Sequence, residues 1–169
     1  MNFKKNIVII GMPGSGKTTI GKLVAKKLNM KFIDMDKYIE EKENNTISDM
    51  FDLGEEYFRN KETNCALELS KEISIVIATG GGIVKKQENM DYLKINSIIV
   101  FLNRPIEKII SDIDTNSRPL LKENIENIHN LYNNRIHLYK KYCDIEILNE
   151  KTLDNAVQNI VNALEKIKD

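Results

Sequence analysis

The stretch Gly11-Met12-Pro13-Gly14-Ser15-Gly16-Lys17-Thr18 has the spacing G-x-x-x-x-G-K-[ST] of a phosphate-binding loop. A glycine-rich turn leaves successive backbone N–H groups unpaired, and no Cβ keeps a phosphate away from them. A helix that follows adds further N–H groups and the positive end of its dipole. Lys17 can reach the β- and γ-phosphates, and the Thr18 hydroxyl is an oxygen ligand suited to Mg²⁺. The stretch predicts a nucleoside triphosphate site formed by Gly14, Ser15, Gly16, Lys17, Thr18 and Thr19.

The segments on either side of this loop favour the same interpretation. Residues 6–10 (Asn-Ile-Val-Ile-Ile) are a short, β-branched apolar run, as expected for a buried parallel strand. After the loop, Ile20, Leu23, Val24 and Leu28 recur at helical spacing. An ordinary glycine-rich turn between a strand and a helix is the alternative, and the four fixed positions with both flanks make it the weaker one.

Length and composition indicate one soluble domain covering residues 1–169. Lys+Arg and Asp+Glu are equal at 25 each, so no net field favours nucleic acid or an anionic membrane. The apolar run near the N-terminus ends at Gly11, which is too soon for a signal peptide or a membrane span. Cys65 and Cys143 fit no metal spacing and cannot make a disulfide framework. We therefore expect a monomer in a reducing, cytoplasmic setting.

Strand and helix patterns alternate along the rest of the chain. Further strands are expected over residues 31–34, 74–79, 97–102 and 144–148, and helices over 37–44, 55–72, 86–94, a short segment starting at Pro105, the apolar face from Ile125 to Tyr139, and 153–167. Thr46 is expected to cap one more short helix. Such alternation indicates an α/β protein whose parallel sheet is covered by helices on both faces.

Ligands of these sheets bind beyond the carboxyl ends of the strands. The loop at 11–18, the pair Asp34 and Asp36, and the triplet Gly80-Gly81-Gly82 each follow an expected strand directly. We therefore expect these three clusters, which are distant in sequence, to form one site at one edge of the sheet.

Asp34 and Asp36 are two residues apart, so in an extended segment both carboxylates face the same side. One carboxylate would be an outer ligand of the Mg²⁺ held by Thr18. The other would accept a hydrogen bond from an acceptor hydroxyl and orient it for in-line attack. The alternative is that one of them is the N-cap of the helix after Asp36.

The glycine triplet and the segment 111–124 are candidate parts of the same site. Three consecutive glycines after a strand favour close approach of a ligand to backbone N–H groups, and a flexible turn without a ligand is the alternative. Residues 111–124 are polar, show little periodicity and contain Arg118-Pro119. We expect this segment to be a mobile flap.

Arginines are scarce in this lysine-rich chain, and three of them are candidate site residues. Arg59 lies on an expected helix, Arg118 in the expected flap and Arg135 on the helix with the apolar face. A guanidinium can donate two parallel hydrogen bonds to a carboxylate or a phosphate, which an ammonium cannot. Arg59 and Glu62 are i,i+3 neighbours on an expected helix, where a solvated surface salt bridge is the default alternative.

Taken in order, these motifs resemble those of the shikimate kinases, a family with the P-loop fold of the nucleoside monophosphate kinases. The resemblance covers nearly the whole chain. The matching segments are the loop at 11–18, Phe32-Ile33-Asp34-Met35-Asp36, Ile47-x-x-x-Phe51 followed by Gly54-Glu55-x-x-Phe58-Arg59-x-x-Glu62, Gly80-Gly81-Gly82, Arg118-Pro119-Leu120-Leu121, and Arg135-x-x-x-Tyr139. The resemblance implies a three-layer α/β kinase domain with a central parallel five-stranded sheet, a mobile lid near 111–124 and a substrate-binding helical region near 36–62.

The resemblance also implies a role for each candidate residue. Lys17 and the loop amides would bind the phosphates of ATP, Thr18 and Asp34 would hold Mg²⁺, and Asp36 would contact the shikimate hydroxyls as base or orienting group. Arg59 and Arg135 would clamp the shikimate carboxylate, and the amides of Gly80, Gly81 and Gly82 would bind ring hydroxyls. Glu62 would support Arg59, and Phe51 and Phe58 would wall the pocket. Arg118 would come down with the lid onto the transferring phosphoryl group. The implied substrates are ATP and shikimate, with no nucleic-acid or membrane partner.

The chain departs from the family at the expected adenine contact. Many members carry an adenine-stacking arginine in the helix before the lid, and residues 107–112 here read Glu-Lys-Ile-Ile-Ser-Asp. Residues 149–152 (Asn-Glu-Lys-Thr) also lack an arginine that some members use. We therefore expect adenine stacking to be either weaker than in such members or made by other residues.

Other functions remain open at the level of sequence. A gluconate-type or nucleoside monophosphate kinase shares the fold, and two arginines available for one carboxylate favour shikimate over both. A catalytically silent ATP-binding module is the alternative outside the enzymes, and the presence of Lys17, Asp34, Asp36 and Arg118 together argues against it. The Asn-Lys-x-Asp segment that reads guanine in GTP switches is absent from the sequence.

Overall fold

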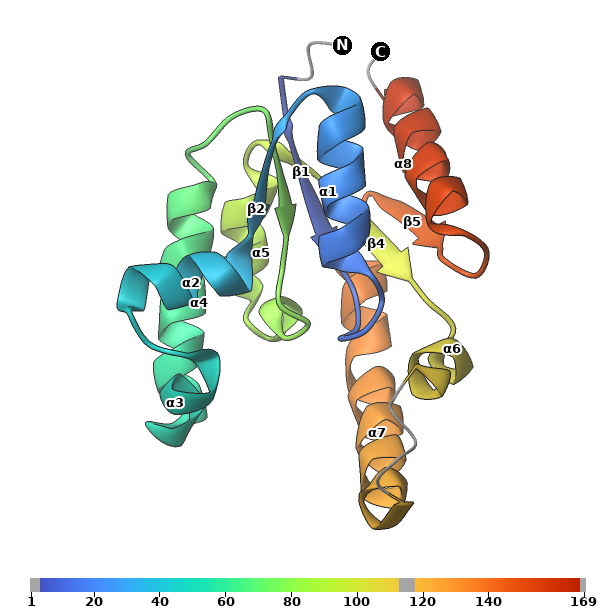
Figure 1. Ribbon diagram of the computed structural model, residues 1–169. Coiled ribbons are helices and arrows are strands. Elements are labelled where there is room, and N and C mark those ends of the chain that lie inside the picture. Colours follow the sequence, from blue (N-terminus) through green and yellow to red (C-terminus); the bar gives the residue numbers. More distant parts are fainter. Residues whose placement is uncertain (1–3, 113–117, 168–169) are drawn as a thin grey trace.

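A five-stranded parallel sheet with the strand order β2-β3-β1-β4-β5 forms the centre of the molecule (Figure 1). Its strands are β1 (Asn6–Ile10), β2 (Lys31–Asp34), β3 (Ile75–Ala78), β4 (Ser97–Asn103) and β5 (Ile145–Leu148). The structure is a computed structural model that describes residues 4–112 and 118–167, with side chains for 4–112 and 125–167. All five predicted strands are confirmed, with ends that differ by one residue at most.

Helices cover both faces of the sheet, as predicted. Helices α1 (Lys17–Leu28) and α8 (Leu153–Ile167) pack on one face, where Ile7 and Ile9 of β1 meet them. Helices α4 (Glu55–Leu69), α5 (Gln87–Lys94) and α7 (Arg118–Tyr142) cover the other face, where Val8 and Ile10 point. Because β1 is buried on both sides, its sequence is a continuous apolar run rather than an alternating one. The predicted three-layer α/β fold is confirmed.

The remaining helices stand around the end of the sheet where the strands finish (Figure 1). They are α2 (Met35–Glu43), α3 (Ile47–Asp52), α6 (Ile106–Ser111) and the short 3-10 helix η1 (Ile83–Lys85). Thr46 caps α3 as predicted, because its hydroxyl accepts the N–H of Asp49 at 3.1 Å. The sequence did not predict η1, which is too short to show a period.

Several helix boundaries differ from the prediction. Helix α2 covers Met35–Glu43 instead of 37–44, and α5 begins at Gln87 instead of residue 86. Helix α4 ends at Leu69 instead of residue 72, since the next residues turn through i,i+3 hydrogen bonds. Pro105 lies just before α6 rather than at its first position. Helix α7 already begins at Arg118, so part of the expected flap is helical, and residues 113–117 lie outside the described residues.

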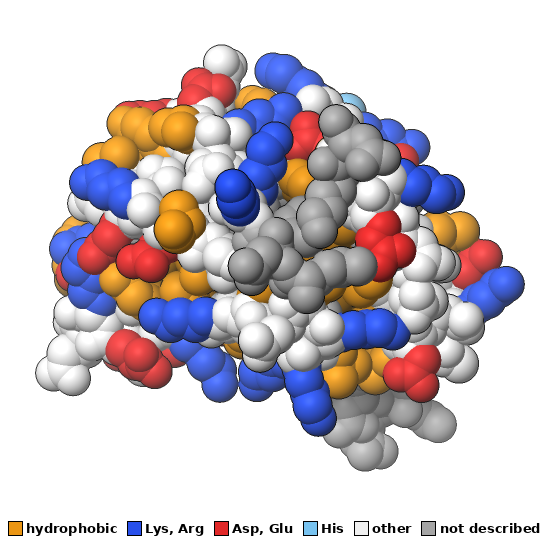
Figure 2. Space-filling view, turned by 90° about the horizontal axis from the view of Figure 1, so that it is seen from above, with side chains coloured by type: hydrophobic (Ala, Val, Ile, Leu, Met, Phe, Trp, Pro, Cys, Tyr) orange, Lys and Arg blue, Asp and Glu red, His pale blue; other side chains and the backbone are white. Residues whose placement is uncertain are grey.

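The two ends of the described chain are both at the opposite end of the sheet, where the strands begin (Figure 1). On this side of the molecule, basic and acidic side chains are interspersed (Figure 2). This mixture agrees with the balanced charge of the sequence, 25 basic against 25 acidic residues. Within the described ranges, none of the helices has the length and apolar character required to cross a bilayer.

Candidate functional site

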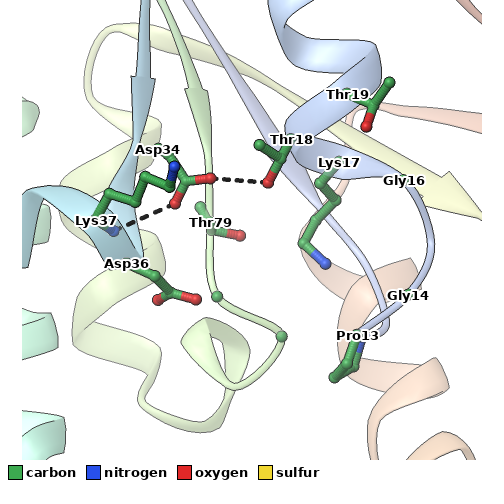
Figure 3. A pocket seen from close by; sticks show the side chains of 12 residues that line it. Pro13, Gly14, Gly16, Lys17, Thr18, Thr19, Asp34, Asp36, Lys37 and Thr79 are labelled. Carbon is green, nitrogen blue, oxygen red and sulfur yellow. Dashed lines mark hydrogen bonds between the residues drawn. The ribbon is translucent and has the colours of Figure 1, made fainter. Parts of the chain in front are cut away.

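A cleft of about 510 Å³ lies beyond the carboxyl ends of β1, β2 and β3 (Figure 3). Its lining residues are Pro13, Gly14, Gly16, Lys17, Thr18, Thr19, Asp34, Asp36, Lys37, Thr79, Gly80 and Gly81. Each of the three clusters expected from the sequence contributes to this lining. The predicted meeting of the glycine-rich loop, the two aspartates and the glycine triplet is therefore observed.

The loop between β1 and α1 has the backbone geometry that its glycines permit. Gly14 and Gly16 have φ values of +75° and +94°, a region that other residues rarely adopt. Gly16 stands directly before α1, so the N-terminus of this helix opens onto the cleft. Loop amides and a helix N-terminus together form a binding site for an anion.

Lys17 is a buried cation that folds back over this loop. Its Nζ donates to the carbonyl oxygens of Gly11 at 2.9 Å and Met12 at 2.7 Å. Burial lowers the pKa of Lys17 to about 8, against the opposite influence of Asp36 and Asp34. The positive charge that it brings to the cleft suits a ligand carrying several negative charges.

Ser15 is placed differently from its neighbours in the loop. Its side chain is fully buried and does not line the cleft, and its N–H donates to the Met12 carbonyl at 3.1 Å. Gly14, Gly16, Thr18 and Thr19 do line the cleft. A contact of Ser15 with a phosphate stays a prediction.

Asp34 joins the end of β2 to the start of α1. The Thr18 hydroxyl donates to its Oδ2 at 2.8 Å, and the Lys37 N–H donates to its Oδ1 at 3.3 Å, which makes Asp34 the N-cap of α2 (Figure 3). Asp34 is therefore the N-cap of α2, which is the alternative considered from the sequence. It uses one carboxylate oxygen for the cap and the other for Thr18, so both contacts are made at once. A hydroxyl beside a carboxylate is the kind of oxygen pair that Mg²⁺ accepts when phosphates and water complete its shell. No cluster of three or more His, Cys, Asp or Glu side chains suited to a metal occurs in the described part of the chain.

Asp36 lies in the first turn of α2, so the expected extended conformation of residues 34–36 is wrong. The chain passes from strand to helix after Asp34, and both carboxylates still line the cleft. Burial raises the pKa of Asp36, the charge of Asp34 raises it further, and Lys17 lowers it. Asp36 is therefore a more basic carboxylate than an exposed aspartate.

The glycine triplet is packed against three other parts of the site, and a side chain at any of its positions would clash with one of them. A Cβ on Gly80 would lie 2.7 Å from Asp36 Oδ1, and one on Gly82 would lie 2.5 Å from Arg59 Nη1. A Cβ on Gly81 would lie 2.7 Å from Pro13 Cδ of the phosphate loop. Because successive Cα atoms are about 3.8 Å apart, the carboxylate, the loop and the guanidinium each adjoin one of three neighbouring positions of this turn.

Arg59 is buried, with 7% of its surface exposed, so the surface salt bridge considered for it is not what the structure shows. Its Nη1 donates to Glu62 Oε2 at 2.8 Å and its Nε to Glu55 Oε1 at 3.2 Å. Its guanidinium carbon lies 5.6 and 5.2 Å from the ring centres of Phe51 and Phe58. These contacts fix the orientation of the guanidinium beside Gly82.

Arg135 lies on α7, one turn before Tyr139, which is fully buried. The Tyr139 hydroxyl donates to the Gly81 carbonyl at 2.6 Å, so α7 is attached to the glycine triplet. Burial raises the pKa of Tyr139 to about 12, and nearby Arg135 acts in the opposite direction. Arg135 also lowers the pKa of Lys17, although burial has the larger effect there. Arg135 therefore lies close to the cleft, while the side chain of Arg118 is outside the described residues.

Comparisons with known proteins agree with this geometry. A sequence model of the family described as Shikimate kinase matches residues 13–165. The shikimate kinase of Clostridium botulinum (strain Eklund 17B) is 52% identical over 157 residues, covering 93% of this chain and 95% of that relative. The chain belongs to the shikimate kinase family.

Solved structures of shikimate kinases share the fold. The shikimate kinase from Acinetobacter baumannii, solved in complex with shikimate, has a TM-score of 0.88 and 34% identity, covering 98% of this chain and 95% of that one. A gluconokinase from Sinorhizobium meliloti reaches a TM-score of 0.59 with 13% identity, over the full length of both chains. At that identity the second likeness shows the fold alone.

The sequence did not identify three residues that line the cleft: Pro13, Lys37 and Thr79. Thr79 directly precedes the glycine triplet, and its hydroxyl donates to the Ile9 carbonyl at 3.1 Å. The available signal was its position at the end of a predicted strand, directly before the glycine triplet. Lys37 and Pro13 carried none, because an exposed lysine and a variable loop position have no distinguishing pattern.

Proposed function

We propose that this protein transfers the γ-phosphoryl group of ATP to the 3-hydroxyl of shikimate, giving shikimate 3-phosphate and ADP. One observation carries the proposal: the glycine triplet holds Asp36, Arg59 and the phosphate loop against three successive residues. A group that binds triphosphate, a basic carboxylate and a carboxylate-binding guanidinium therefore adjoin in one place. An acceptor that carries both hydroxyls and a carboxylate suits this arrangement.

The phosphate end of the cleft supplies charge and alignment. Lys17 and the amides of the loop would bind the phosphates of ATP, and Lys17 would exchange its two carbonyl contacts for phosphate oxygens. Thr18 and Asp34, already paired at 2.8 Å, would hold Mg²⁺, whose charge neutralises the phosphates when it is bound. Phosphoryl transfer depends mostly on such positioning and charge stabilisation.

The acceptor end would be formed by Asp36, Arg59, Arg135 and the glycine triplet. Arg59 and Arg135 would bind the carboxylate of shikimate, since a guanidinium donates two parallel hydrogen bonds to such a group. Asp36 would accept a hydrogen bond from the 3-hydroxyl, a role supported by its raised pKa. The amides of the triplet would bind ring hydroxyls.

We further propose that residues 1–169 act as one kinase domain, in which the region near 36–62 binds the acceptor. The segment near 111–124 would close as a lid and bring Arg118 to the transferring phosphoryl group, excluding water from the reaction. Both cysteines are outside any disulfide, which suits a cytoplasmic enzyme. We also propose that the protein is a monomer, which light scattering after gel filtration would test.

The decisive experiment measures ADP release by the purified protein with a panel of acceptors. We expect turnover with shikimate, little with gluconate or nucleoside monophosphates, and little ATP hydrolysis without an acceptor. A Lys17→Ala variant is the control and should lose several orders of magnitude in turnover while binding shikimate normally. Activity with gluconate or a nucleotide but not with shikimate would refute the assignment. Absence of transfer in a single-turnover reaction would leave an ATP-binding module.

A further inference from the structure

Five carbonyl oxygens of the phosphate loop accept hydrogen bonds from other groups in the protein. A concave run of backbone N–H groups that binds an anion is called a nest. A nest that binds phosphate must turn its N–H groups toward the ligand and its carbonyl oxygens away, because a carbonyl oxygen repels a phosphate. The carbonyls of Gly11 and Met12 accept hydrogen bonds from Lys17. The carbonyl of Gly16 accepts the N–H of Ile20 at 2.9 Å, within α1.

Of the three carbonyls between Met12 and Gly16, those of Gly14 and Ser15 accept hydrogen bonds from side chains outside the cleft. Arg104 Nη1 donates to the Gly14 carbonyl at 2.9 Å, and Asn149 Nδ2 donates to the Ser15 carbonyl at 3.0 Å. Arg104 directly follows β4 and Asn149 directly follows β5, on the half of the sheet away from β2 and β3. Neither residue lines the cleft.

Both donors make a further contact within the protein. Asn149 is buried, and its backbone N–H donates to the Asn103 carbonyl at 2.7 Å. Arg104 also pairs through Nη2 with Asp112 Oδ2 at 2.7 Å, at the end of α6. A Cβ on Gly16 would lie 3.4 Å from Asn149 Nδ2, so the loop and this amide are in tight contact. The Asn149 hydrogen bond is therefore buried, whereas the Arg104 hydrogen bond lies at the surface and is supported by the ion pair with Asp112.

The orientation of the peptide groups follows from these contacts. In a trans peptide the C=O and the next N–H point to opposite sides. Holding the Ser15 carbonyl toward β5 therefore turns the Gly16 N–H toward the cleft. Holding the Gly14 carbonyl toward Arg104 turns the Ser15 N–H toward the Met12 carbonyl, which it reaches at 3.1 Å, and so closes the turn of the loop.

We infer that Arg104 and Asn149 are positioning residues for the nucleotide: they hold the Gly14 and Ser15 carbonyls away from the cleft and so preset the phosphate nest. The inference rests on the nucleotide site of the proposed function and is independent of the acceptor. A kinase with another acceptor would give the same nucleotide readout, so the failure of one proposal is distinguishable from the failure of the other.

The test compares binding of MgADP and of shikimate by calorimetry, with KM values for ATP and shikimate, in the full-length protein. Asn149→Ala removes a neutral donor, so its effect cannot come from lost charge. We expect MgADP to bind about 10-fold more weakly, as for a lost hydrogen bond to a buried group, with shikimate binding changed by less than about 2-fold. Asn149→Asp has the same shape but presents an acceptor to the Ser15 carbonyl, and should weaken MgADP more than alanine does.

Arg104 is tested in the same way. Arg104→Ala should weaken MgADP by about 10-fold or more, and Arg104→Lys should recover part of the loss, since lysine still donates one hydrogen bond and keeps the charge. Asn159→Ala, at an exposed asparagine of α8, is the matched control and should bind MgADP as the wild type does. MgADP binding within about 2-fold of the wild type in both Asn149 variants would overturn the inference. An equal loss of MgADP and shikimate binding would also overturn it, because it would indicate general unfolding rather than a preset nest.

Discussion

At the scale of single residues, two cations are buried in or beside the cleft, Lys17 and Arg59, and different groups stabilise their charges. The buried charge of Lys17 is stabilised by two backbone carbonyl oxygens. These oxygens carry no net charge, so the positive charge of Lys17 remains available to a ligand. Arg59 is compensated by Glu62 and Glu55 and by two aromatic rings. A buried charge without such partners costs several kcal/mol of stability, so these contacts are what allow cations to lie inside the protein.

Arg135 gives a direct test of the acceptor end. Arg135→Ala should weaken shikimate binding by about 2–5 kcal/mol, because a carboxylate would lose a partner in a partly desolvated site. The KM for ATP should change little, since Lys17 and the loop remain. Calorimetric titration with shikimate, together with both KM values, would check this. Unchanged shikimate binding would show that Arg135 is an ordinary surface charge and does not bind the acceptor.

Glu62 predicts a pH dependence of stability. Burial raises its pKa above the ordinary 4.5, while Arg59 acts in the opposite direction, and its Oε1 has no hydrogen-bond partner among the described residues. Above pH 4.5 the folded protein therefore binds more protons at this site than the unfolded chain does. The contribution of Glu62 to the free energy of unfolding must then fall as the pH rises through the raised pKa.

Urea denaturation of the wild type and of Glu62→Gln between about pH 4.5 and 7.5 would measure this contribution. Gln cannot ionise, so the difference in free energy of unfolding, wild type minus variant, should decrease with increasing pH. A difference that is constant, or that increases, would contradict the prediction.

At the scale of elements, the turn between β3 and η1 is where the two ends of the cleft meet. Its glycines are required because Asp36, Pro13 and Arg59 fill the space that a side chain would occupy. None of the three has a positive φ, so close approach and not backbone conformation explains them. Helix α7 is attached to the same turn through Tyr139 and Gly81.

Two adjacent substitutions in this turn should therefore have different kinetic effects. Gly82→Ala pushes against Arg59 and should raise the KM for shikimate roughly 10- to 100-fold, since small displacements of a binding group are costly. Gly80→Ala pushes against Asp36 and should chiefly lower kcat. Steady-state kinetics of the two variants would check this, and identical effects on both parameters would contradict it.

At the scale of the whole molecule, the strand order places β1 in the centre of the sheet, between β3 and β4. The loop after β1 therefore contacts residues at or just after the ends of the other four strands: Asp34 at the end of β2, Gly81 after β3, Arg104 after β4 and Asn149 after β5. A ligand bound to this loop is coupled to the entire sheet.

Nucleotide binding should consequently raise the stability of the whole protein. At 100 times its Kd, MgADP should add about 2.7 kcal/mol. For a chain of this size that corresponds to an increase in Tm of roughly 5–10 °C. Thermal denaturation with and without MgADP would measure it, with Lys17→Ala, which should show a much smaller increase, as control. A Tm that saturating MgADP leaves unchanged would contradict a folded nucleotide site.

The sequence by itself determined the strands, most helices and the phosphate loop. Apolar runs such as residues 6–10 and the spacing of Gly11, Gly16, Lys17 and Thr18 are local patterns, and local patterns fix local structure. It also predicted that Asp34, Asp36 and Gly80–Gly82 would share an edge, because parallel strands end on the same side.

Only the tertiary structure decided the contacts between segments distant in the chain. That Gly82 faces Arg59, that Tyr139 holds Gly81, and that Asn149 holds Ser15 depends on the strand order and on the packing of α4 and α7. The burial of Arg59 could not be predicted from the sequence for the same reason. An i,i+3 ion pair has the same sequence pattern on a surface and in a core. Side-chain burial is a property of what packs against a residue, and no local pattern contains that information.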